Sequence, residues 1–121
     1  MTQRGGDLDA SILRAYDIRG VVGQSLRVVD AVAIGRAFAT IATARLGRQP
    51  RLCVGYDGRI SSPELEEALV KGLKVSGAEV LCVGLGPTPM LYFAVEALGA
   101  DGGVMVTGSH NPPEYNGLKL L

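Results

Sequence analysis

The segment TGSHNPPEYNG, residues 107–117, gathers the side chains of this chain that are best suited to chemistry. It contains Ser109, whose hydroxyl could act as a nucleophile or carry a phosphoryl group, and beside it His110, the only histidine of the chain. The simplest alternative is a surface turn, because Ser, Asn, Pro and Gly are all turn residues and Ser109 would fit an ST-turn. Taken alone, the segment favours a turn. A catalytic role for Ser109 is predicted only if the fold places this segment where ligands bind.

The elements around this segment follow a regular pattern. Three short apolar runs predict strands: RLCVGY (51–56), EVLCVG (79–84) and GGVMVTG (102–108). Two segments with helical periodicity lie between them, over 61–77 and 88–99. Serines and Pro63 open the first helix, Thr88 is the expected cap of the second, and Gly77 and Gly99 are placed to end them. This alternation predicts βαβ units and a parallel sheet covered by helices.

The region before residue 51 predicts two further elements. The segment 30–47 is a helix candidate with Asp30 as a plausible cap, and YDIRGVVG (16–23) is a strand or an extended lead-in segment. At the other end, LKLL (118–121) resembles the beginning of a strand. We therefore expect a fragment of a longer protein, in which the continuation of that strand is missing.

Three loops are expected to converge where chemistry occurs in such folds. The loops 57–61, 85–89 and 107–117 each follow a predicted strand, and ligands of parallel sheets bind at the carboxyl ends of the strands. Familiar motifs fail here: the residues two positions from Ser109 are not glycines, as a nucleophile elbow requires, and Pro89 interrupts a dinucleotide fingerprint. No P-loop sequence occurs either. Esterase, Rossmann dehydrogenase and P-loop functions are therefore not indicated.

A phosphate is the ligand that the remaining residues favour. Arg19 and Lys119 could converge on the loop of Ser109, and Arg, Lys and loop N–H groups suit a phosphate better than an acyl intermediate. Each residue also has a plainer interpretation. Tyr16 and Arg19 could belong to a solvated strand edge, Lys119 could be an exposed strand lysine, and Asp57 with Arg59 could make a turn and a local ion pair. Their joint occurrence on one predicted sheet edge is what favours a phosphate site.

Composition limits the other classes of function. A chain of 121 residues suits one domain, and 12 basic residues balance 12 acidic ones, which gives no overall field to attract nucleic acid or a membrane. No apolar signal segment opens the chain, so the cytoplasm is the expected location. Cys53 and Cys82 lie in apolar runs and are expected to be buried free thiols, without metal-ligand spacing.

Four blocks, RAYDIRG, GYDGRIS, GPTP and TGSHNPPEYNGLK, resemble in order and approximate spacing the N-terminal domain of the α-D-phosphohexomutases. The phosphomannomutase/phosphoglucomutase branch is the nearest match, and the resemblance covers about Ile12 to Leu121. It implies a three-layer α/β/α fold with a mostly parallel mixed sheet, filling residues 1–121 as domain I of a four-domain enzyme. That enzyme interconverts hexose 1-phosphates and hexose 6-phosphates through a bisphosphorylated sugar.

The same resemblance implies a role for particular residues. Ser109 matches the phosphoserine, whose phosphate supplies one ligand to Mg²⁺, and glucose or mannose 1,6-bisphosphate is the implied activator and intermediate. His110 and Lys119 match positions of proton transfer or phosphate stabilisation, Arg19 a residue of the catalytic cleft, and Tyr16 one that lines it near the substrate. The residues of the implied supporting loops are Thr107, Gly108, Asn111, Asp57 and Arg59.

The metal site of the implied enzyme is incomplete in this sequence. The Asp-rich DGDxDR loop that completes the metal site belongs to the second domain and does not occur here. We therefore expect little activity from this chain alone, with phosphorylated hexoses and the missing domains of its parent chain as partners. A phosphoglucosamine mutase domain and a non-catalytic module that binds a phosphosugar or a partner protein remain alternatives. Sugar preference and oligomeric state stay open.

Overall fold

The computed structural model describes residues 13–14, 17–108 and 114–120. The described elements, in chain order, are β1 (Leu13–Arg14), β2 (Asp17–Val21), α1 (Val28–Leu46), β3 (Arg51–Tyr56), α2 (Ser62–Val75), β4 (Glu79–Leu85), α3 (Thr88–Ala97), β5 (Gly102–Val106) and β6 (Tyr115–Leu120).

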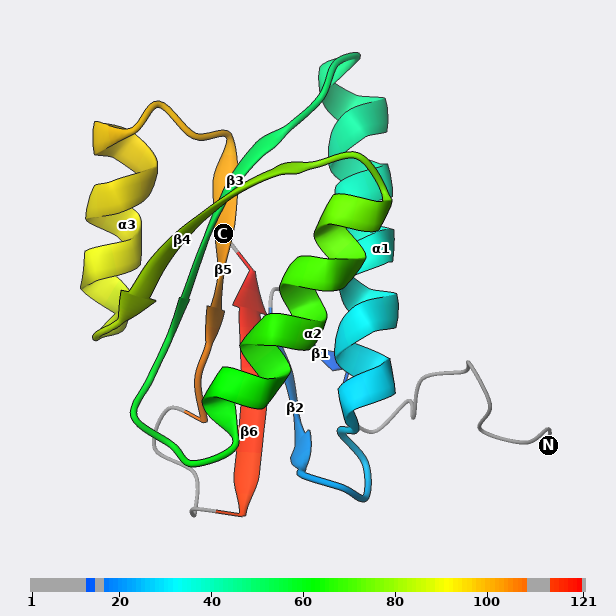
Figure 1. The fold of residues 1–121 in the computed structure, drawn as a ribbon, viewed down its shortest axis with the longest axis vertical. Coiled ribbons are helices and arrows are strands. Elements are labelled where there is room, and N and C mark those ends of the chain that lie inside the picture. Colours follow the sequence, from blue (N-terminus) through cyan, green and yellow to red (C-terminus); the bar gives the residue numbers. More distant parts are fainter. Residues whose placement is uncertain (1–12, 15–16, 109–113, 121) are drawn as a thin grey trace, which may run out of the picture.

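One sheet carries the described strands, in the order β1-β2-β6-β5-β3-β4. Helices α1 and α2 cover one face of this sheet and α3 covers the other (Figure 1). Strand β3 runs parallel to both β4 and β5, while β6 pairs antiparallel with β5 and with β2. The three-layer α/β/α class with a mixed sheet, and the βαβ units from 51 onward, are therefore confirmed.

The parallel half of the sheet is smaller than the sequence predicted. Only the part formed by β5, β3 and β4 is parallel among the described strands, because β6 pairs antiparallel with both of its neighbours. A parallel neighbour needs a crossover of a dozen or more residues, so the short connection over 107–114 returns β6 antiparallel. Strand β6 also begins at Tyr115, three residues earlier than the LKLL run indicated.

Two expected helix caps are placed differently in the structure. Helix α1 has Arg27 at its N-cap, and Asp30 instead occupies the third helical position. From there the Asp30 carboxylate accepts the Arg27 backbone N–H at 2.8 Å and pairs with the Arg27 guanidinium at 2.9 Å. Helix α3 begins at Thr88 itself, after Pro87, without a side-chain cap bond. The Asp30 side chain thus satisfies the backbone N–H of the N-cap residue of α1 from within the first helical turn. At the N-cap of α3, Pro87 has a fixed φ angle and offers no hydroxyl as a cap.

Two apolar clusters, one on each face, hold the layers together. The larger lies between the sheet and helices α1 and α2, and the smaller joins Cys53 and Met105 of the sheet to Leu91 and Ala94 of α3. Each βα connection thereby presses a helix onto the strands, which fixes the loops at their carboxyl ends.

Helices α1 and α2 cross in close contact at a pair of glycines. A Cβ on Gly72 would overlap the backbone carbonyl of Val32, and a Cβ on Gly35 would overlap that of Leu69. The crossing therefore requires glycine on both helices, and it fixes the position of α2 against α1.

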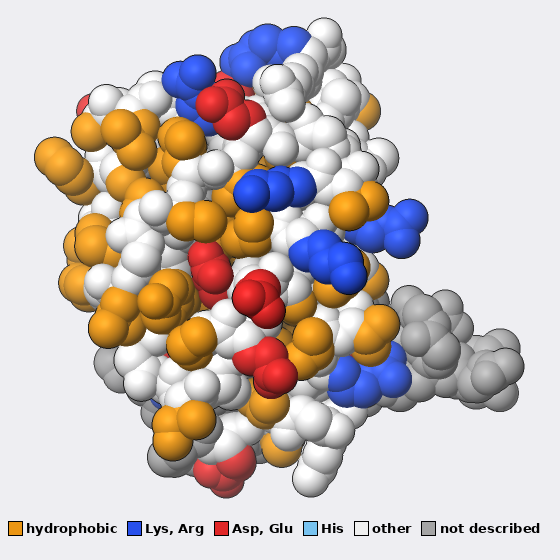
Figure 2. Space-filling model, in the orientation of Figure 1, with side chains coloured by type: hydrophobic (Ala, Val, Ile, Leu, Met, Phe, Trp, Pro, Cys, Tyr) orange, Lys and Arg blue, Asp and Glu red, His pale blue; other side chains and the backbone are white. Residues whose placement is uncertain are grey.

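One group of exposed apolar side chains lies on the side of α3. Figure 2 shows hydrophobic groups gathered over α3 and β4. The exposed large apolar residues of these two elements are Leu85, Tyr92 and Phe93. Cys82 is also exposed, contrary to the expectation of a buried thiol, because β4 is the outermost strand; Cys53, in the middle of the sheet, is buried. No helix in the described part of the chain is long and apolar enough to cross a membrane.

Candidate active site

The loops that follow the three parallel strands meet at one edge of the sheet. The Asp57 N–H donates to the Val106 carbonyl at 2.9 Å, and the Gly86 N–H donates to the Tyr56 carbonyl at 3.0 Å. These bonds join the ends of neighbouring strands across the sheet. The predicted convergence of the three loops is confirmed for their described parts.

Asp57 is the hydrogen-bonding centre of this edge. One carboxylate oxygen accepts the backbone N–H of Arg59 at 3.1 Å and the Ser62 hydroxyl, and the other accepts the backbone N–H of Gly108 at 3.1 Å. The Arg59 guanidinium completes the group with an ion pair of 3.3 Å. The carboxylate therefore connects the loop after β3, the start of α2 and the loop after β5.

The ionised form of Asp57 is the favoured one. Burial by itself disfavours the charge, but hydrogen bonds from Ser62, Arg59, Thr107 and Gly108 outweigh it and lower the pKa of the carboxyl below its ordinary value. A carboxylate that is ionised and accepts several donors is a fixed anchor, because moving it would leave those donors unpaired.

Gly108 is the point where Arg59 packs against the loop after β5. A Cβ built on Gly108 would overlap the guanidinium and Nε of Arg59, so the absence of a side chain lets Arg59 cross over this backbone. Two side chains therefore fix the position of Gly108: Asp57 accepts its N–H, and the guanidinium of Arg59 packs over its Cα.

Asn116, on β6, is a buried polar residue that the sequence analysis did not single out. Its side chain is 0 % exposed, and its amide nitrogen lies 2.8 Å from the Ser61 hydroxyl and 3.0 Å from the Ser62 hydroxyl. Ser62, equally buried, bonds Asp57 in turn. Local rules assign both serines to a helix start and the Asn-Gly pair to a turn. Ser61 does stand at the N-cap of α2, but without a side-chain cap bond, and both serine hydroxyls contact the Asn116 amide instead. Only the pairing of β6 with β5 and β2 brings Asn116 to the serines, and this pairing cannot be predicted from the local sequence.

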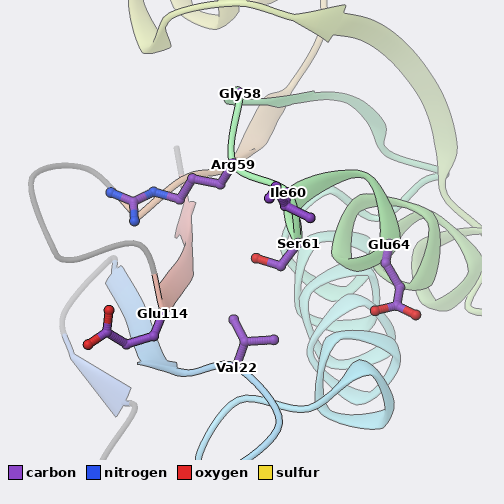
Figure 3. A pocket seen from close by; sticks show the side chains of 7 residues that line it. All are labelled: Val22, Gly58, Arg59, Ile60, Ser61, Glu64 and Glu114. Carbon is purple, nitrogen blue, oxygen red and sulfur yellow. The ribbon is translucent and has the colours of Figure 1, made fainter.

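A pocket of about 510 Å³ adjoins this edge. Figure 3 shows its lining, in which Ser61 from the start of α2 and Val22 face the space between Arg59 and Glu64. Glu114 lies on the same side as Arg59. Two carboxylates accompany the one guanidinium in the described lining, so its charge does not indicate an anion, and we assign it no ligand.

The structure brings some of the predicted site residues together. Asp57, Arg59, Thr107 and Gly108 share the network described above. Lys119 lies in β6 and pairs with Met105 of β5. Met105 precedes Thr107 by two residues. The backbone of Arg19 in β2 lies opposite Gly117, whose carbonyl accepts the Thr107 N–H at 2.9 Å. Tyr16, Ser109, His110 and Asn111 lie outside the described residues.

The described residues do not form a metal site by themselves. No group of three or more His, Cys, Asp or Glu side chains in this part of the chain is arranged to hold an ion. The expected ligand, a phosphate on Ser109, lies outside the described residues, and the expected Asp-rich loop is not in this sequence. We therefore derive no chemical step through Mg²⁺ from this structure.

Comparison with known proteins places these features in context. Residues 10–121 match the family model for the phosphoglucomutase/phosphomannomutase α/β/α domain I. The chain is 51% identical over 120 residues to a phosphomannomutase/phosphoglucomutase of Pseudomonas aeruginosa, covering 99% of this chain and 26% of the relative. It is 51% identical over 110 residues to a phosphoglucomutase of Neisseria gonorrhoeae, covering 91% and 24%.

A solved structure agrees with these relatives. The phosphoglucomutase/phosphomannomutase family protein of Burkholderia thailandensis superimposes with a TM-score of 0.85 at 45% identity, over 93% of this chain and 26% of that one. The chain thus spans about a quarter of the length of the proteins that it is similar to.

Proposed function

Because this chain belongs to the phosphoglucomutase/phosphomannomutase family as its α/β/α domain I, we propose that Ser109 is the phosphoryl-accepting serine of a hexose-phosphate mutase. The observation that carries the proposal is the hold on Gly108, the residue before Ser109. An ionised carboxylate binds its N–H and a guanidinium covers it, at the edge of the sheet where ligands of such folds bind. A nucleophile benefits from this because phosphoryl transfer depends on positioning and charge neutralisation more than on covalent chemistry.

In the proposed reaction, the Ser109 hydroxyl attacks a phosphorus atom of glucose or mannose 1,6-bisphosphate. The bond between serine oxygen and phosphorus forms as the bond from phosphorus to the sugar oxygen breaks. The serine proton passes to a base, and the departing sugar oxygen takes up a proton. The products are phosphoserine and a hexose monophosphate. In the other half-reaction, phosphoserine transfers its phosphoryl group to the free hydroxyl of the isomeric hexose monophosphate, which regenerates the bisphosphate and the free serine. The two half-reactions together interconvert the 1-phosphate and the 6-phosphate.

The remaining residues of the proposed site have supporting roles. We assign His110 and Lys119 to proton transfer or phosphate stabilisation, Arg19 to phosphate binding and Tyr16 to the wall near the substrate. The strand register supports the two cations, because Lys119 and the backbone of Arg19 lie within two residues of the Thr107–Gly117 pairing. Thr107, Gly108 and Asn111 with Asp57 and Arg59 would support the serine.

Mannose and glucose phosphates are the proposed substrates. The relatives from Pseudomonas aeruginosa and Neisseria gonorrhoeae carry phosphomannomutase or phosphoglucomutase names, and AYDIRG with TGSHNP favours that branch over a phosphoglucosamine mutase. Mg²⁺ remains part of the proposal as the ion that would neutralise the transferred phosphoryl group when bound. Its further ligands would come from outside this chain.

Intact-mass measurement tests the proposal directly. The purified chain is incubated with glucose 1,6-bisphosphate beside the Ser109→Ala variant, and both are weighed over time. We expect one added phosphoryl group on the wild type and none on the variant. Absence of the group from the wild type, or its equal addition to both, would overturn the proposal and favour a non-catalytic binding module.

A further inference from the structure

The buried side chain of Asn116 lies at one end of a chain of hydrogen bonds that ends at the Gly108 backbone. Gly117 donates its N–H to the Asn116 amide oxygen at 2.8 Å, and the Asn116 amide nitrogen donates to Ser62 at 3.0 Å. Ser62 then bonds one oxygen of Asp57, whose other oxygen accepts the Gly108 N–H at 3.1 Å. The chain of bonds therefore connects β6, the start of α2, the loop after β3 and the loop after β5.

The direction of every bond in this chain is fixed from both ends. Because the Asn116 oxygen is occupied by a backbone donor, its NH₂ group must face the serine hydroxyls. An ionised carboxylate can only accept, so the single hydroxyl proton of Ser62 must point to Asp57. Both requirements agree, since Ser62 accepts from Asn116 and donates to Asp57.

We infer that Asn116 is a positioning residue for the serine of the phosphoryl-transfer step, acting through Ser62 and Asp57 on the Gly108 backbone. The inference rests on the proposed function of Ser109, which follows Gly108 directly. Asn116 and Ser62 are each 0 % exposed, so water cannot replace either partner without opening the contact between β6 and α2. Their role is therefore to keep one orientation of Asp57, and with it one position of the loop backbone.

Ser61 provides a matched control within the same contact. Its hydroxyl also accepts from Asn116, at 2.8 Å, but makes no bond to Asp57 in the described part of the chain. Ser61→Ala and Ser62→Ala thus delete the same atom at adjacent positions, and only the second interrupts the path to Gly108. Asn116→Asp supplies a third variant of almost unchanged shape, which turns the two donors into acceptors and competes with Asp57 for the Ser62 proton.

Amide resonances of the ¹⁵N-labelled chain give a readout that a general loss of stability would not produce. We expect the Gly108 N–H resonance to move in Ser62→Ala and Asn116→Asp while remaining in place in Ser61→Ala. The Gly117 N–H, which keeps its own acceptor in both serine variants, should stay unchanged in them. An unmoved Gly108 resonance in Ser62→Ala and Asn116→Asp, or an equal movement in Ser61→Ala, would overturn the inference.

The rate of Ser109 phosphorylation by glucose 1,6-bisphosphate supplies the second readout. We expect Ser62→Ala to slow it about tenfold, the size of effect that misplacement of a nucleophile by a fraction of an ångström can give, and Ser61→Ala to leave it within about twofold. Equal rates in the wild type and Ser62→Ala would contradict the positioning role. If the wild type accepts no phosphoryl group, the proposed function fails, but the comparison of amide resonances still decides whether Asn116 positions Gly108.

Discussion

At the scale of single residues, the site depends on the carboxylate of Asp57, which accepts more hydrogen bonds than a carboxylate in an isolated surface turn would. Asp57 accepts backbone N–H groups from both loops and the hydroxyl of a buried serine, and it pairs with Arg59. Hydrogen bonds to a charged group contribute about 1.5–3 kcal/mol each, so the orientation of this side chain is strongly determined. Its loss should affect both the stability of the domain and the loop of Ser109.

Asp57→Asn should destabilise the chain by about 2 kcal/mol near neutral pH, because an amide keeps the shape but loses the charge. The pKa of Asp57 lies below its ordinary value of 3.8, so the stabilisation is complete above that pH and disappears as the pH falls through the folded-state pKa. Urea denaturation from pH 7 to pH 2 should show the difference between wild type and variant shrinking on acidification.

Asp101→Asn is the matched control for that series. Asp101 lies at the opposite end of the sheet, where Arg48 and the Arg51 backbone lower its pKa to about 2. The variant should leave Ser109 phosphorylation at the wild-type rate, because Asp101 makes its hydrogen bonds to Arg48 and Arg51 and not to the serine loop. A pH-independent effect of Asp57→Asn would contradict the assignment of an ionised carboxylate.

Gly108→Ala should displace the Arg59 guanidinium, because the added methyl group would occupy the space where that side chain crosses the loop. We expect a loss of about 1–2 kcal/mol in the free energy of unfolding. In the Arg59→Ala background the same methyl group meets no guanidinium, so its cost should fall by at least half. Equal costs in the two backgrounds, measured by urea denaturation, would show that Arg59 does not cover Gly108.

At the scale of elements, the crossing of α1 and α2 decides where the first turn of α2 presents its serines. Gly72 lies against the Val32 carbonyl and Gly35 against that of Leu69, so the helices approach through their backbones. The buried face of α2, with Leu65, Leu69 and Leu73, then packs on the sheet. This packing places Ser62 beneath Asp57.

Gly72→Ala should therefore destabilise the fold by about 1–3 kcal/mol, since neither helix backbone can move without disturbing the shared core. Gly58→Ala serves as the control, because a Cβ there meets nothing within 4 Å and should change the free energy of unfolding by no more than about 0.5 kcal/mol. Similar values for the two variants in chemical denaturation would contradict a close helix crossing.

Much of this arrangement was predictable from sequence, and the two buried polar residues that were missed share one cause. The apolar runs of β3, β4 and β5 and the buried face of α2 are periodic patterns, and the structure has them where they were predicted. Asp57 and Arg59 were also expected beside the serine loop. Ser62 and Asn116 were missed because their partners are 54 residues apart, so only the pairing of β6 within the sheet brings them together.

At the scale of the whole molecule, the chain has the fold of one domain and spans about a quarter of the length of its relatives. Phosphoryl transfer needs a bound metal, an oriented sugar and fixed cations around the phosphate, in addition to the nucleophile. The described residues hold Gly108, the residue before the proposed nucleophile, and their acidic groups form no cluster of metal ligands.

We therefore expect the 121-residue chain to interconvert glucose 1-phosphate and glucose 6-phosphate at a negligible rate, even where Ser109 accepts a phosphoryl group slowly. A coupled assay for glucose 6-phosphate, run beside Ser109→Ala to detect contaminating host enzyme, measures this. Turnover of about one per second or faster in the wild type alone would contradict the expectation.

The central claim, that Ser109 carries the phosphoryl group and that Asp57 holds its loop, is tested most directly by mapping the modified residue over time. The wild type, Asp57→Asn and Asp101→Asn are incubated with glucose 1,6-bisphosphate, and tandem mass spectrometry locates the phosphoryl group in peptides that cover 107–117. We expect modification of Ser109 in all three, at equal rates in the wild type and Asp101→Asn and about tenfold more slowly in Asp57→Asn. A phosphoryl group found on another residue, or an unchanged rate in Asp57→Asn, would contradict the account.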